Sequence, residues 1–372
     1  MKDTILFGDC KETLSAFLPQ SARTCVTSPP YYGLRDYGTA TWIGGDPNCK
    51  HRKVGKQGSN CITGHKNHDD MGSVGDYIFK SVCPLCGAVR QDSQLGLEET
   101  PEEYIESLVS VFREVRNILT DDGTLWVNLG DSYYNYRPGK GQSYPKQSVS
   151  KTKQDLPDEC NKRGKKLDGL KEKDLIGIPW LFAFAMRKDG WYLRQDIIWH
   201  KPNPMPESVK DRCTKSHEYI FLFSKNRKYF YDNEAIKEPA KDWGTRDRTK
   251  GKYHNTGTGL QPHSGLTKSY ERKNKRSVWS VTVKPYKEAH FATYPPDLIE
   301  PCILAGSEEG DTILDPFMGA GTTAAVAKSL GRYYLGCELN EDYGNLIQKR
   351  IQDYQPVNKV AQEPTVNILD II

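Results

Sequence analysis

The sequence predicts an α/β fold built on a mostly parallel sheet, and two observations carry this prediction. Strand and helix patterns alternate at both ends of the chain, over residues 5–27 and 295–354, and such alternation is typical of βαβ units. A glycine-rich turn at 316–321 also separates a strand pattern from a helix pattern, as in ligand-binding α/β sheets. The 372 residues are enough for one large domain with insertions or for two ordinary domains.

Each element follows from a local pattern. Proline and glycine forbid a regular element at 28–38, whereas apolar residues at helical spacing predict a long helix after Pro101. Pro179 near a first turn marks the start of another helix. The predicted elements are strand 5–9, helix 11–18, strand 24–27, helix 101–119, strand 123–131, helix 178–188, strands 191–200 and 218–223, helix 295–304, strand 312–315, helix 322–330, strand 332–337 and a helix ending near 354.

Three segments interrupt these patterns. Residues 41–93 are rich in Gly, Asn, Cys and His and predict an insertion, and the basic stretch 135–172 predicts a mobile loop. Residues 202–289 are largely polar and predict a small irregular lobe, apart from a strand at 218–224 that we assign to the main domain. The main domain is therefore expected in three parts, 1–40, 94–201 and 290–354, followed by a tail at 355–372.

Composition and charge narrow the class of protein. Hydrophobic residues make up 37% and charged residues 27%, as in globular proteins. No apolar run approaches the ~20 residues of a membrane span, and the N-terminus lacks the apolar core of a secretory signal, so we expect a cytoplasmic protein. The net charge of +4 favours a polyanionic partner only weakly. Without export, the ten cysteines are expected as reduced thiols or metal ligands.

The segment Asp315–Thr323, sequence DPFMGAGTT, carries the cofactor signal. Glycines at the carboxyl end of a strand let the backbone approach a ligand, and the helix that follows offers free amides. Glu338 follows about twenty residues later, where an acid commonly binds the two hydroxyls of a ribose. The alternative at this point is a plain glycine-rich turn with a surface glutamate.

The sequence Ser28-Pro29-Pro30-Tyr31 indicates the chemistry. An exocyclic amino group of a base is a poor nucleophile because its lone pair is delocalised into the ring. Ser28 Oγ and the Pro29 carbonyl oxygen are suited to accept its two hydrogens and to localise that lone pair. Tyr31 supplies a ring on which a flipped base can stack. Taken alone, the segment favours an ordinary proline-rich loop capped by an aromatic residue.

Together the two segments resemble the amino-methylating DNA methyltransferases, in the permuted order with the catalytic motif before the cofactor motif. The resemblance implies a Rossmann-like S-adenosylmethionine-dependent methyltransferase fold that acts on double-stranded DNA. Carried over residue by residue, it implies cofactor-binding roles for Asp9, Asp315, Phe317, Gly319, Gly321, Thr322 and Glu338.

The same resemblance bears on the target base. In this family a serine before Pro-Pro usually accompanies cytosine-N4 methylation, and aspartate or asparagine accompanies adenine-N6 methylation. Ser28 therefore favours cytosine-N4, with adenine-N6 methylation as the first alternative. A DNA-binding protein that has lost the activity is the second. A cognate restriction endonuclease is a candidate partner, and the sequence leaves the oligomeric state open.

The cysteines outside these motifs fall into a core group and a metal-binding group. Cys302 follows a proline, as in covalent cytosine-carbon-5 methyltransferases, but it shares an apolar helical face and is predicted to be a buried core residue. Cys10, Cys25 and Cys337 adjoin apolar strands and receive the same interpretation. In the insertion, the metal-ligand spacing of CxH and CxxC predicts a structural zinc site. Its ligands are Cys49, His51, Cys83 and Cys86, and Cys61, His65 or His68 could replace Cys49 or His51.

The DNA-contacting surface is predicted from the segment that follows strand 191–200. Lys201 and Asn203 lie in a Trp-x-Lys-x-Asn segment that the family places beside the target pocket, although a structural loop is equally compatible. Base edges are read chiefly by Arg, Lys, Asn and Gln, and region 202–289 is rich in them. The DNA contacts predicted there are Arg212, Lys215, Arg272 and Arg276.

Overall fold

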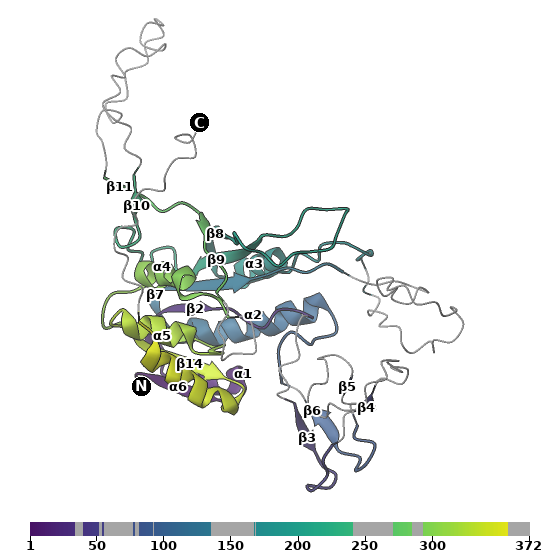
Figure 1. Ribbon diagram of the computed structural model, residues 1–372. Helices are drawn as coiled ribbons and strands as arrows, with labels where there is room; N and C mark the ends of the chain where they lie inside the picture. Colours follow the sequence, from purple (N-terminus) through teal and green to yellow (C-terminus); the bar gives the residue numbers. More distant parts are fainter. Residues whose placement is uncertain are drawn as a thin grey trace, which may run out of the picture.

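An eight-stranded sheet organises the chain (Figure 1). The computed structural model describes residues 1–33, 40–51, 82–91, 93–134, 167, 169–240, 271–284 and 293–355, with two short strands at 54–55 and 77–78. In spatial order the strands of the sheet are β1 (Thr4–Phe7), β14 (Tyr333–Glu338), β13 (Thr312–Asp315), β2 (Ala22–Thr27), β7 (Leu119–Leu129), β9 (His217–Ser224), β8 (Tyr192–His200) and β12 (Val278–Ser280).

The strand directions confirm the predicted, mostly parallel sheet. Within it, β9 alone runs against the others, pairing antiparallel with β7 and β8. The central pair is β13 and β2, which are parallel with Leu314 opposite Cys25. From β13 the chain continues outward to the neighbouring strand β14, and from β2 it continues in the opposite direction to β7. Ligands of such sheets bind at the carboxyl ends of the strands where the order reverses.

Helices cover both faces of the sheet and bury two apolar clusters. One face carries α1 (Cys10–Thr13), α2 (Pro101–Ile118) and α3 (Ile178–Lys188). The other carries α4 (Pro296–Gly306), α5 (Thr322–Ser329) and α6 (Gly344–Asp353). Figure 1 shows α4, α5 and α6 grouped together, with α2 and α3 farther along the sheet.

Helix α2 shows how local sequence sets these elements. Thr100 and Glu103 form a reciprocal capping box, with Glu103 N donating to Thr100 Oγ1 at 3.2 Å and the Glu103 carboxylate accepting from Thr100 N. Pro101 occupies the first turn, where its missing amide hydrogen costs nothing. Tyr104, Leu108 and Phe112 are fully buried, because their spacing places them on the face that meets the sheet.

Several small elements lie outside the sheet. Strands β3 (Thr41–Ile43) and β6 (Val89–Gln91) pair antiparallel, as do β4 (Val54–Gly55) and β5 (Tyr77–Ile78). Figure 1 shows both pairs together at the lower right, beside the main domain. A third pair joins β10 (Glu238–Pro239) to β11 (Arg272–Lys273), and a 3₁₀ turn, Glu341–Tyr343, precedes α6. The predicted basic loop 135–172 and the tail 355–372 lie almost entirely outside the described residues.

Two predicted elements differ from the structure. The helix expected at 11–18 is only α1 followed by a 3₁₀ turn, Leu14–Ala16. Leu14 and Phe17 are both buried while Leu18 is exposed, and residues three apart align in a 3₁₀ turn. Strand β12 lies within the region expected to form a separate lobe, yet it extends the main sheet beside β8, because Trp279 is buried in the core.

Candidate active site

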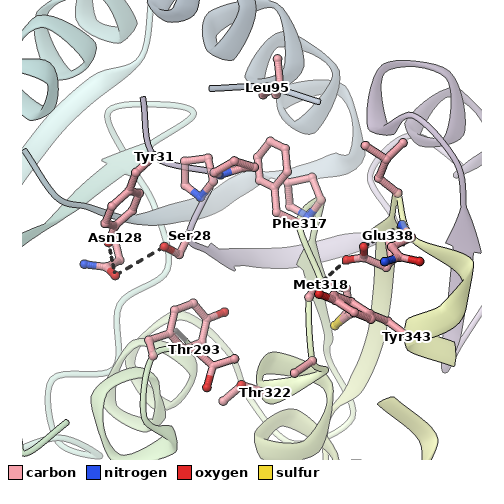
Figure 2. Close-up of a pocket in the computed structure, with 18 of the residues that line it drawn as sticks. Ser28, Tyr31, Leu95, Asn128, Thr293, Phe317, Met318, Thr322, Glu338 and Tyr343 are labelled. Atoms are coloured by element: carbon pink, nitrogen blue, oxygen red, sulfur yellow. Dashed lines mark hydrogen bonds between the residues drawn. The ribbon is translucent and has the colours of Figure 1, made fainter. Parts of the chain in front are cut away.

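A cavity of about 650 Å³ opens at the carboxyl ends of β13 and β2 and continues over β14 and β8. It brings the proline-rich and glycine-rich segments onto one space, with Ser28 and Tyr31 on one side and Phe317, Met318 and Glu338 on the other (Figure 2). Of the predicted site residues, those that line the cavity are Asp9, Ser28, Pro29, Pro30, Tyr31, Lys201, Asn203, Phe317, Gly319, Thr322 and Glu338.

Asp315 holds the two segments together. Its carboxylate accepts from Thr27 Oγ1 at 2.6 Å, one residue before Ser28, and from Thr323 Oγ1 at 2.5 Å in α5. It also accepts from the Tyr294 hydroxyl at 3.1 Å and from Phe317 N at 3.0 Å. Burial raises the pKa of this carboxyl, and these four donors oppose that rise.

Asp315, which the resemblance gives a cofactor-binding role, is not among the residues that line the cavity. The side chain is 1% exposed, and its described contacts are internal. Gly321 does not line the cavity either. It begins α5 with φ +79°, and a Cβ there would lie 2.8 Å from Ile347 Cγ2. We assign this glycine to helix packing, since only glycine fits that conformation and space.

A partly buried polar network surrounds Ser28 and Tyr31. The Tyr31 hydroxyl lies 2.8 Å from Glu218 Oε2 and 3.1 Å from Asn128 Oδ1. Asn128 Nδ2 donates to the same Glu218 oxygen at 3.3 Å, and Ser28 Oγ lies 3.5 Å from Asn128 Oδ1. Burial, followed by the negative charge of Glu218, raises the pKa of Tyr31 well above its usual value. The Tyr31 hydroxyl therefore stays neutral, and its contacts with Glu218 and Asn128 hold the ring in place.

Asn128 and Glu218 were not among the predicted site residues. Asn128 interrupts the buried strand β7, and Glu218 is the second residue of the apolar strand β9. A polar residue in a buried strand needs partners, and that signal was available in the sequence. Lys201, at the end of β8, forms an ion pair with Glu218 and lies 4.3 Å above the Trp199 ring.

Backbone amides define the opposite wall. Gly319 N donates to Glu338 Oε2 at 2.7 Å, and Asn340 N donates to Glu338 Oε1 at 2.8 Å. Burial raises the pKa of Glu338 to about 7, although these two amides oppose the rise. Asp9 caps α1 by accepting from Lys11 N at 2.9 Å. Sequence reasoning missed Asn340 and Tyr343, which also line this wall.

Comparison with known proteins identifies the family. The family model described as DNA methylase, for amino-methylating N6/N4 enzymes, matches residues 22–349. The chain belongs to this family. The resemblance inferred from the two motifs is thereby confirmed, and this DNA methylase uses S-adenosylmethionine as its methyl donor.

Individual relatives agree with this assignment. The type II methyltransferase M.XycI of Xanthomonas campestris pv. cyanopsidis is 39% identical over 94% of this chain and 87% of its own length. M.SmaI of Serratia marcescens, also a type II methyltransferase, is 39% identical over 93% and 90%. The solved structure of the cytosine-N4-specific PvuII DNA methyltransferase superposes with a TM-score of 0.54 at 15% identity, covering 96% of this chain and 88% of that one. Because only 15% of the residues are identical, this superposition supports the fold of the chain and nothing more specific.

The predicted DNA-contacting residues of the methylase fall into two groups. Lys201 and Asn203 line the cavity, whereas Arg212, Lys215, Arg272 and Arg276 do not. Arg212 pairs with Glu207 at 2.5 Å, Arg276 pairs with Glu238 at 2.6 Å and Arg272 donates to Lys237 O at 2.9 Å. Burial lowers the pKa of Lys215.

The four predicted metal ligands converge. The ligand atoms of Cys49, His51, Cys83 and Cys86 all lie within 4.8 Å of one another. Cys49 Sγ and Cys83 Sγ are 3.9 Å apart, and Cys86 Sγ is 3.6 Å from His51 Nδ1. Tetrahedral zinc with ordinary bond lengths would require about 3.8 Å and about 3.6 Å for such pairs. The donor set therefore fits zinc, while the proposed substitutes Cys61, His65 and His68 lie outside the described residues.

The four cysteines that the sequence assigned to the core are buried. Cys302 is 1% exposed on α4, and burial raises the pKa of its thiol far above the usual value. A nucleophilic cysteine requires an accessible thiolate, so covalent catalysis by Cys302 stays rejected. Cys10, Cys25 and Cys337 are also buried. Among the described residues, none of the helices has the length and apolar character of a membrane span.

Proposed function

We propose that this methylase transfers a methyl group to the exocyclic N4 amino group of cytosine in duplex DNA, after the base has flipped out of the helix. The observation that carries the proposal is one cavity shared by Ser28-Pro29-Pro30-Tyr31 and by the Phe317–Glu338 wall. Ser28 supports cytosine, because serine before Pro-Pro usually accompanies cytosine-N4 methylation in this family.

The Glu338 wall has the chemistry to hold S-adenosylmethionine. Glu338 keeps acceptor capacity beyond the amides of Gly319 and Asn340, which suits a pair of ribose hydroxyls. Phe317 offers an aromatic face, and Asp9 and Thr322 add polar groups on the same cavity. When bound, S-adenosylmethionine supplies a methyl group on a positively charged sulfur. A cofactor held along this wall would lie in the same cavity as Ser28.

The Ser28 wall acts on the base. Ser28 Oγ and the Pro29 carbonyl accept the two amino hydrogens, which localises the lone pair on the nitrogen. The Tyr31 ring stacks on the base, and its hydroxyl is anchored by Glu218 and Asn128. Positioning of nitrogen and methyl carbon in line supplies most of the acceleration.

Product analysis tests the proposal. Duplex DNA methylated by the purified protein is digested to nucleosides, and the modified nucleoside is identified by mass spectrometry. N4-methylcytosine is the expected product. N6-methyladenine would overturn the cytosine assignment while keeping the family chemistry. Absence of labelled-methyl transfer to any DNA would favour a binding protein without activity, which the intact cavity argues against.

The pH dependence of cofactor binding tests the role of Glu338. Because burial raises its pKa to about 7, the carboxyl is protonated below that pH and ionised above it. The ionised form accepts hydroxyl hydrogens better, so affinity for S-adenosylmethionine should increase from pH 6 to pH 8, by up to about tenfold. Titration calorimetry at several pH values measures this. Glu338→Gln should bind weakly with a flat pH profile, and an equal slope in both proteins would rule Glu338 out.

Gly130 tests the placement of Tyr31. A Cβ at this position would lie 2.6 Å from Tyr31 Cε2, so Gly130→Ala forces the ring out of place. We expect methyl transfer to fall by roughly 10- to 100-fold, because misplacement by about 1 Å has that cost, while the dissociation constant of S-adenosylmethionine stays unchanged. Melting temperature is measured alongside. Full activity at unchanged stability would show that Tyr31 does not need its present position.

Further assignments rest on the same proposal. Zinc bound by Cys49, His51, Cys83 and Cys86 would be structural, since four protein ligands leave no open position. Lys201 and Asn203 would contact the flipped nucleotide, and the arginines and lysines outside the cavity would contact DNA phosphates or base edges. The type II relatives favour a restriction–modification role in a bacterial cytoplasm, with a partner endonuclease.

A further inference from the structure

Met205 lies at the mouth of the active-site cavity. It is 84% exposed, the most exposed large apolar side chain in the described part of the chain, and it also lines the cavity. A residue with both properties has to lie at the opening. Isolated exposed apolar residues are common, so the location of Met205 carries more weight than its exposure.

The backbone that carries Met205 is stiff and anchored. Residues 202–206 read Pro-Asn-Pro-Met-Pro, and each proline fixes its own φ and restricts the residue before it. Asn203 ties the segment to the chain after β12, with Asn203 Nδ2 donating to Val283 O at 3.1 Å and Val283 N donating to Asn203 Oδ1 at 3.0 Å. Met205 is therefore held at the opening by a rigid strap rather than by a free loop.

The cavity below Met205 is the space into which the target base would turn. Lys201 and Trp199, just before the strap, line the same cavity as Ser28. A base that leaves the duplex abandons its stacking partners and opens a gap. Apolar side chains, methionine among them, are inserted between base steps by other DNA-binding proteins, and the unbranched methionine side chain adapts to irregular spaces.

We propose that Met205 enters the base stack as the target base leaves it, and fills the gap in the duplex. The inference rests on the proposed base-flipping function. Met205 makes no bond in the reaction. It lowers the cost of the flipped state, and its effect should therefore depend on how firmly the target base is paired.

The test compares Met205→Ala with wild type on two duplexes that carry the site methylated by the wild-type enzyme. In one duplex the target base is paired, and in the other it faces an abasic position. Met205→Ala should lose about tenfold in single-turnover rate on the paired duplex and remain within about twofold on the abasic one, since an unpaired base costs less to extrude. Met205→Leu should retain most of the rate on both duplexes.

Two controls separate the possible outcomes. Val209→Ala alters an exposed apolar residue of the same region that does not line the cavity, and it should behave as wild type. A fluorescent base analogue beside the target reports flipping directly, and its signal should fall in Met205→Ala. Equal losses of rate on both duplexes, or no loss at all, would overturn the proposed insertion of Met205 into the base stack. If the wild-type protein itself shows no flipping signal, the proposed function fails instead.

Discussion

Ser28→Ala should lose methyl transfer by about 100-fold or more while binding S-adenosylmethionine normally. Ser28 Oγ faces the cavity and lies 3.5 Å from Asn128 Oδ1, so it is free to accept a hydrogen from the base. Removing one preorganised partner of the developing charge costs on the order of 10²–10³ in other active sites. Single-turnover kinetics with labelled cofactor measure the chemical step.

Ser93→Ala is the matched control for this prediction. Ser93 is an exposed serine that lines the same cavity, but it lies outside the Pro-Pro segment. Its removal should change the rate by less than about threefold, whereas Ser28→Ala should change the rate and leave the dissociation constant of the cofactor alone. A Ser28→Ala protein with a third or more of the wild-type rate would show that the Pro29 carbonyl suffices.

Much of the fold and both cavity walls could be predicted from local sequence. The alternation of strands and helices specified the sheet, and Ser28 and Glu338 were identified from motifs of a few residues. The parallel pairing of β13 with β2 then places both motifs at one edge. Such a pairing is not encoded in any short segment, but βαβ order makes it the expected outcome.

Contacts between distant residues were harder to predict. The motif predicts Asp315 as a cofactor ligand, yet its buried carboxylate accepts hydrogen bonds from Thr27 and Thr323. Glu218 reaches Asn128 only because strand β9 pairs antiparallel with β7. Strand β12 was hidden in a polar region, since three residues around Trp279 are too short a pattern to recognise.

Loss of a metal ligand should have the second large effect. Cys83→Ser removes one of the four ligands, so it should abolish zinc binding, measured by elemental analysis. The effect should be large because structural zinc contributes on the order of 10 kcal/mol to the folding of small domains. Cys213→Ser is the matched control, since Cys213 is an exposed thiol outside the cluster. It should retain zinc and activity.

The consequence should reach the DNA side of the cavity first. The chain leaves the cluster at Ala88 and arrives at the cavity wall with Gln94 and Leu95. There Gly33 N donates to Gly96 O at 2.8 Å, close behind Tyr31. Among the described residues, the Glu338 wall comes from the ends of β13 and β14 and the turns after them, and the amides that bind Glu338 belong to Gly319 and Asn340. Cys83→Ser should therefore weaken DNA binding and methyl transfer while cofactor affinity persists. Loss of cofactor binding first would contradict this division, because it would mean that the insertion supports the whole domain and not the catalytic segment alone.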